Sequence, residues 1–126
     1  MKKRIKTASM FVVLLTITFS NVLGQTGSER RISFQRGRSS AIVKGVIASD
    51  DAITYLIGAR SGQTMDLDIS KGAAFRLFTP SGEALQGGKG VSGATEDLEE
   101  TGDYRIEVEH RSQKKSVTFT LKVAIR

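Results

Sequence analysis

The 126-residue chain contains no cysteine and no tryptophan, and it has one histidine and one proline. Without cysteine it forms no disulfide, offers no thiol nucleophile or thiolate metal ligand, and has no residue to carry a lipoprotein lipid. The only histidine, His110, excludes a site with several histidine ligands and leaves one candidate base for a Ser-His-Asp arrangement. We therefore expect a non-enzymatic protein with no metal and no cofactor.

A long apolar run is missing except near the amino terminus. Four basic residues, Lys2, Lys3, Arg4 and Lys6, precede an apolar segment at residues 8–19, and Val22-Leu23-Gly24 follows as a cleavage signal. The segment is shorter than the roughly 20 apolar residues of a membrane-spanning helix, and threonines and a serine dilute it. We predict a secretory signal peptide at residues 1–24, cleaved before Gln25, with no membrane span in the mature chain and a periplasmic or secreted location.

The mature chain also lacks a strong excess of one charge. Four of the 19 Lys and Arg residues precede residue 25, so 15 remain against 13 Asp and Glu, a net charge of +2. Nucleic-acid binding normally uses a clustered basic face, and we expect no nucleic-acid partner. Removing 24 residues from 126 leaves 102, which is enough for one hydrophobic core.

Short alternating segments fill this mature chain. Met65, Leu67 and Ile69, for example, alternate with Asp66 and Asp68, as in a half-buried strand. Turn signals separate such segments about every 8 to 12 residues, the pattern of an antiparallel sandwich. We predict a flexible lead-in at residues 25–30 and an all-β domain at residues 31–126, a single antiparallel β-sandwich of about eight short strands. The expected strands are 31–34, 40–47, 52–59, 64–69, 73–79, 83–86, 103–109 and 117–126.

Glycines mark two special places in this pattern. Gly45 interrupts the β-branched segment at residues 40–47 and indicates a bulge or a close approach of another element. Residues 87–93 contain four glycines in seven residues and are predicted to form a loop, a place where binding residues often lie. This loop does not match the phosphate-binding pattern G-x-x-x-x-G-K-[ST].

The segment 98–108 combines a turn with a strand. Thr101-Gly102-Asp103 forms the turn, and Tyr104, Ile106 and Val108 then share one face of the strand. Tyr104 has two possible roles: a tyrosine corner, in which its hydroxyl bonds a nearby backbone group, or a hydroxyl displayed to a partner. Its position on the face of two aliphatic residues favours the structural role.

Charged residues cluster in three places, each with a functional and a plain interpretation. Asp50, Asp51, Asp66 and Asp68 offer oxygen ligands for calcium, but they lack a D-x-D-x-D-G loop and fit a turn and the solvent face of a strand. The acidic residues at 96–103 could be read as the carboxylate pair of a glycosidase, but crowded acids around a turn are usually solvated, and we expect that here. Arg105, Arg111, Lys114 and Lys115 form either a solvated hairpin tip or a cationic prong for an acidic cleft.

Taken in order, several short motifs resemble the periplasmic inhibitors of goose-type lysozyme. The matching residues are Phe34-x-x-Gly37-x-Ser39-Ser40-Ala41, Gly45-x-Ile47, Tyr55-x-x-x-Ala59-x-x-Gly62-Gln63 and Gly102-x-Tyr104-x-x-x-Val108, within residues 32–125. Gly62-Gln63 and Gly102-Asp103-Tyr104 are also similar to pre-peptidase C-terminal β-sandwich domains. The first resemblance implies a compact β-sandwich that blocks a peptidoglycan hydrolase by inserting loops into its cleft.

The resemblance also suggests which residues contact the partner. The corner Thr101, Gly102, Asp103 and Tyr104 matches an S-G-x-Y corner of the family, with Thr in place of Ser. Arg111 falls on the arginine-rich segment that follows, although R-S-Q-K-K replaces a longer R-N-x-x-R run. We therefore expect Arg111, Lys114 and Lys115 to pair with carboxylates of a goose-type lysozyme or another peptidoglycan hydrolase, with the corner beside them. The alternative is an accessory β-sandwich that binds envelope glycan or another exported protein without inhibiting it.

Overall fold

Strands with alternating burial make up nearly all the regular structure of residues 29–126, the part of the chain that the computed structural model describes. In the strand at Gly102–His110, for example, Tyr104, Ile106 and Val108 are buried, and the residues between them are not. The predicted signal peptide lies outside the described residues. The elements are β1 (Glu29–Arg31), β2 (Ser40–Ala48), β3 (Ala52–Ala59), β4 (Thr64–Ile69), β5 (Ala73–Phe78), the 3-10 turn η1 (Gln86–Gly88), β6 (Gly93–Asp97), β7 (Gly102–His110) and β8 (Ser116–Ile125).

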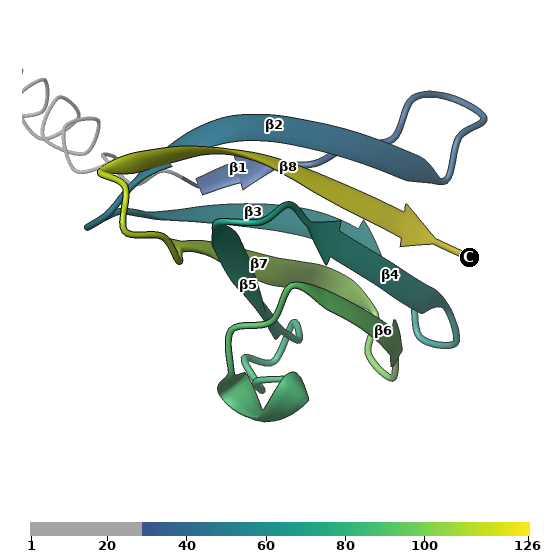
Figure 1. Ribbon diagram of the computed structural model, residues 1–126. Coiled ribbons are helices and arrows are strands. Elements are labelled where there is room, and N and C mark those ends of the chain that lie inside the picture. The colour runs from purple at the N-terminus through teal and green to yellow at the C-terminus, as the bar shows by residue number, and fades with distance from the viewer. Residues whose placement is uncertain (1–28) are drawn as a thin grey trace, which may run out of the picture.

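The strands form two four-stranded sheets that lie as two layers (Figure 1). One sheet has the order β1-β3-β7-β5 and the other the order β2-β8-β4-β6. All strand pairs are antiparallel except β1 with β3, which is parallel. The all-β class is confirmed, and the parallel β1 is the exception to the expected antiparallel pairing.

One hydrophobic core joins the inner faces of both sheets. Tyr104, Phe75 and Ile106 from one sheet, and Phe119 and Leu121 from the other, are fully buried. Two layers that pack around a shared core are the architecture of a β-sandwich. Because side chains alternate, the outward residues of each strand remain free to carry charge.

Three local predictions differ from the structure. The first strand lies at Glu29–Arg31, earlier than the expected 31–34, because these three residues are the ones that pair with β3. No strand forms at 83–86, since Gln86 and the two glycines after it take positive φ values of 56°, 67° and 75° and turn the chain. A strand that was not expected, β6 at Gly93–Asp97, instead pairs with β4.

Candidate functional site

The corner before β7 is built around the Tyr104 hydroxyl. This hydroxyl donates to the Glu100 carbonyl oxygen at 2.7 Å and accepts from the Glu100 backbone N–H at 3.2 Å. The ring is completely buried, and burial raises the pKa of the Tyr104 hydroxyl above its usual value. The structural interpretation of Tyr104 as a tyrosine corner is what these contacts describe.

The other three corner residues are also engaged within the molecule. The Thr101 hydroxyl accepts from the Ser61 backbone N–H at 2.9 Å. The Asp103 carboxylate accepts from both ends of the Arg31 guanidinium, at 3.0 and 2.6 Å, and these hydrogen bonds lower the pKa of Asp103. Gly102 has a φ of +148°, and a Cβ there would lie 3.0 Å from Pro80. The side chains of Thr101, Asp103 and Tyr104 therefore all form hydrogen bonds within the molecule and hold the corner in place.

The basic segment at residues 111–115 is a loop between the two sheets, so the expected hairpin is wrong. Strand β7 pairs with β3 and β5, whereas β8 pairs with β2 and β4, and β7 and β8 are not neighbours in either sheet. We call residues 111–115 the basic loop. Its backbone is fixed by two bonds to neighbouring turns: Arg111 N–H to the Gly72 carbonyl at 2.8 Å, and Ser49 N–H to the Lys115 carbonyl at 2.9 Å.

The corner and the basic loop lie at opposite ends of β7. Gly102, the first residue of β7, and His110, its last, are roughly 26 Å apart at about 3.3 Å per residue. Gly102 pairs with Ala59 at the last residue of β3, and His110 pairs with Ala73 at the first residue of β5. The structure therefore brings Arg111, Lys114 and Lys115 together, and it places the four corner residues elsewhere.

A ladder of alternating charges leads along the outer face of β7 and β5 to the basic loop. Arg76 binds Glu107 at 3.1 Å and Glu109 at 3.5 Å, and Glu109 in turn binds Arg111 Nε at 3.2 Å. Arg105 also binds Glu107, at 3.2 Å, and its guanidinium lies 4.5 Å from the centre of the Phe78 ring. The ladder holds the Arg111 side chain by its Nε edge, although that side chain is still 55% exposed.

A concavity of about 650 Å³, which we call the basic concavity, adjoins the basic loop. Arg111 and Lys114 line it from the loop, and Lys71 lines it from the turn between β4 and β5. Sequence reasoning missed Lys71, because nothing in the sequence shows that the 70–72 turn and the basic loop meet. Lys115 is exposed at the same end but does not line the concavity.

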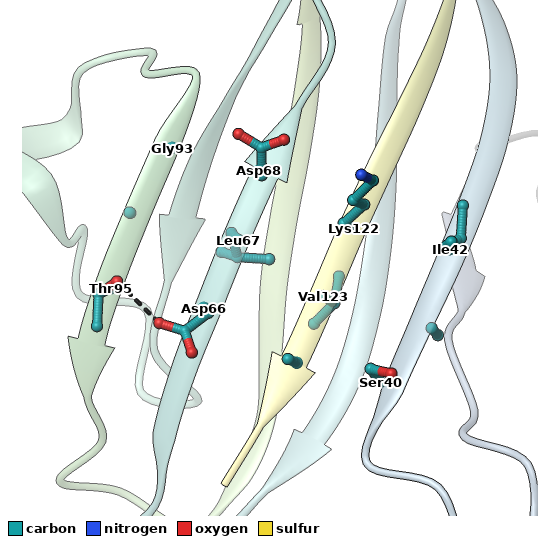
Figure 2. Close-up of a pocket in the computed structure, with 12 residues that line it drawn as sticks. Ser40, Ile42, Asp66, Leu67, Asp68, Gly93, Thr95, Lys122 and Val123 are labelled. Atoms are coloured by element: carbon teal, nitrogen blue, oxygen red, sulfur yellow. Dashed lines mark hydrogen bonds between the residues drawn. The ribbon is translucent and has the colours of Figure 1, made fainter.

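A second concavity, of about 660 Å³, lies on the outer face of the β2-β8-β4-β6 sheet (Figure 2). Asp66 and Asp68 project from β4 there, as the alternation predicted, and Lys122 projects from β8. Asp66 accepts from the Thr95 hydroxyl at 2.8 Å and from Arg126 Nε at 3.1 Å, and these bonds lower the pKa of Asp66. Within residues 29–126, no three acidic or histidine side chains are grouped to hold a metal ion.

The aromatic residues of the described chain are all at least partly buried. Phe34 and Phe78 are intermediate, and the other four are buried: Tyr55, Phe75, Tyr104 and Phe119. Arg105 and Arg76 also cover the Phe78 ring. An exposed aromatic platform for stacking sugars is therefore absent from residues 29–126. Nor does any helix in this part of the chain have the length and apolar character needed to cross a membrane.

Comparison with solved structures finds proteins of the same fold. The PliG protein of Aeromonas hydrophila, a periplasmic inhibitor of g-type lysozyme, superimposes with a TM-score of 0.68 and 29% identity, over 79% of this chain and 96% of that one. The PliG protein of Salmonella Typhimurium, described in the same words, gives 0.65 and 27%, over 80% of this chain and 100% of that one. The resemblance to the PliG inhibitors is confirmed.

The PliG similarity extends over the described sandwich. A mutant of PliG from Escherichia coli gives a TM-score of 0.63 at 22% identity, over 80% of this chain and all of that chain, and it adds support for the fold alone. No protein-family model and no curated protein sequence matches this chain. The PliG proteins are named as inhibitors of an enzyme, which supports the expectation of a non-enzymatic binding protein.

Proposed function

We propose that this PliG-like protein is an exported, non-enzymatic inhibitor of a peptidoglycan hydrolase, in the first instance a g-type lysozyme. The observation that carries the proposal is the basic concavity, where Arg111 and Lys114 face solvent together at one end of the sandwich. Glycoside hydrolases generally work with a pair of carboxyl groups in their cleft, and a cationic projection complements such a cleft. The periplasmic location of the PliG proteins agrees with the predicted signal peptide.

Arg111 is the residue we assign to the central contact. Glu109 holds its Nε, and its two Nη groups make no hydrogen bond within the described residues, 29–126. These Nη groups can bind a partner carboxylate with two parallel hydrogen bonds. Lys114 and Lys115 add charge that speeds encounter with an acidic cleft and raises the salt dependence of binding. In this proposal the four corner residues brace the fold and leave the partner contacts to the basic loop.

The test is an inhibition assay with the purified mature protein and a g-type lysozyme. The wild-type protein should inhibit lysis, and Arg111→Ala should weaken inhibition by about tenfold or more, as expected for an arginine at an interface centre. Arg36→Ala is the matched control, because Arg36 is exposed in the β1–β2 connection. That connection enters β2 at Ser40, whereas the basic loop adjoins the other end of β2, where Ala48 pairs with Ser116. No inhibition by the wild-type protein would overturn the proposed function, and equal effects of both substitutions would overturn the role of Arg111.

A further inference from the structure

A second turn contributes to the basic concavity. Lys71 lies between β4 and β5, about 40 residues before Arg111, and lines the same concavity as Arg111 and Lys114. The Arg111 N–H donates to the Gly72 carbonyl at 2.8 Å, so the backbone directly after Lys71 is bonded to the start of the basic loop. Gly72 itself has a φ of +97°, and a Cβ there would lie 3.0 Å from Val117 of β8. The turn that carries Lys71 is therefore held against both the basic loop and β8.

The charges at this concavity are not balanced within the molecule. Lys71 and Lys114 form no salt bridge within residues 29–126, and Arg111 shares its partner Glu109 with Arg76. No acidic residue lines the concavity, and its other polar side chains are the hydroxyls of Ser112, Ser116 and Thr118. The Ser112 hydroxyl accepts from the Lys114 N–H at 3.1 Å, which leaves its own hydrogen available to a ligand. Three cationic side chains and three hydroxyl groups therefore line the concavity, with no carboxylate among them.

We propose that Lys71, Arg111 and Lys114 form a single site for two neighbouring carboxylates, with Lys71 as its third cation. Two carboxylates match the charge of the site, because Glu109 offsets part of one of its three positive charges. Arg111 binds one carboxylate through its Nη groups, and Lys71 and Lys114 bind the second as point charges. The identification of these carboxylates with the acidic pair of a hydrolase cleft rests on the proposed function, but the site itself does not.

A small dicarboxylate tests the site without any lysozyme. Glutarate added to the mature protein should shift the backbone amide signals of Gly72, Arg111 and Ser112 in a saturable way. Acetate, with one carboxylate, should bind several times more weakly. Lys71→Ala should weaken glutarate binding about threefold or more, as expected for the loss of one exposed charge. Lys122→Ala, an exposed lysine in the middle of β8, should change it by less than about twofold.

The outcomes separate this inference from the proposed function. Shifts scattered over unrelated lysines, or equal binding by wild type and Lys71→Ala at an unchanged thermal midpoint, would overturn the site. Inorganic phosphate that binds the same amides as tightly as glutarate would overturn the assignment to two carboxylates. Glutarate binding that depends on Lys71, in a protein that does not inhibit lysozyme, would uphold the site and overturn the inhibitor function. Inhibition that is lost in Lys71→Ala but kept in Lys122→Ala would support both.

Discussion

Tyr104 stabilises the corner at the start of β7 in two ways: its ring is buried in the core, and its hydroxyl bonds the backbone of the corner. Tyr104→Phe keeps the ring but removes the hydroxyl that bonds both backbone groups of Glu100. Because those groups are left without this partner, we expect the free energy of unfolding to fall by about 1–3 kcal/mol. Urea denaturation of the two proteins measures this difference. Equal midpoints would mean that water replaces the hydroxyl and that the corner does not depend on it.

Three carboxylates that accept hydrogen bonds within the folded chain should make its stability sensitive to acid. Hydrogen bonds from Ser81, Arg31 and Thr95 lower the pKa values of Glu100, Asp103 and Asp66, respectively. Since each pKa is lower in the folded chain than in the unfolded chain, the unfolded chain binds more protons as the pH falls. We therefore expect the thermal midpoint to be constant above about pH 5 and to fall progressively below about pH 4.

The variant Glu100→Gln tests the contribution of one of these carboxylates. The Glu100 carboxylate accepts from the Ser81 N–H at 3.0 Å and from the Ser81 hydroxyl at 2.9 Å. The neutral amide cannot titrate, so the fall in midpoint between about pH 5 and pH 2.5 should be smaller than in wild type. Parallel curves for the two proteins would contradict this assignment.

At the scale of the strands, Gly45 of β2 leaves room for the ring of Phe119, its partner on β8. The sequence leaves a bulge or a close approach open at Gly45, and the structure has the close approach: a Cβ at Gly45 would lie 2.8 Å from Cζ of Phe119. Gly45→Ala should therefore lower the free energy of unfolding by about 1–3 kcal/mol, as overpacking does. Gly93→Ala in β6 is the control, because its Cβ would lie 3.5 Å from the nearest atom, an ordinary contact. Equal denaturation midpoints for these two variants would show that the Phe119 ring moves aside easily.

The alternation of apolar and polar residues predicted most strands, because each strand buries one face and this produces a pattern in consecutive residues. It could not predict pairing partners, which depend on residues far apart in the chain. The pattern over 103–109 and 117–126 suggested one hairpin, whereas β7 and β8 lie in different sheets. For the same reason the sequence placed Arg111 and Lys114 in one loop but gave no sign that Lys71 joins them.

At the scale of the whole molecule, the corner at residues 101–104, which stabilises the fold, and the basic loop, the proposed binding site, lie at opposite ends of the sandwich. Thr101→Ala removes the acceptor of the Ser61 N–H at the corner, and we expect a loss of about 0.5–1.5 kcal/mol in the free energy of unfolding. Inhibition of a g-type lysozyme should then change by less than about twofold, because the rigid β7 keeps the corner roughly 26 Å from the basic loop.

Arg111→Ala should show the reverse behaviour. Its side chain is 55% exposed and pairs only with Glu109 among residues 29–126, so the denaturation midpoint should stay close to that of wild type. Its inhibition constant should rise by about tenfold or more. Measuring unfolding and inhibition on both variants places the partner at one end of the sandwich. A loss of inhibition in Thr101→Ala as large as that in Arg111→Ala would instead require a partner that reaches both ends.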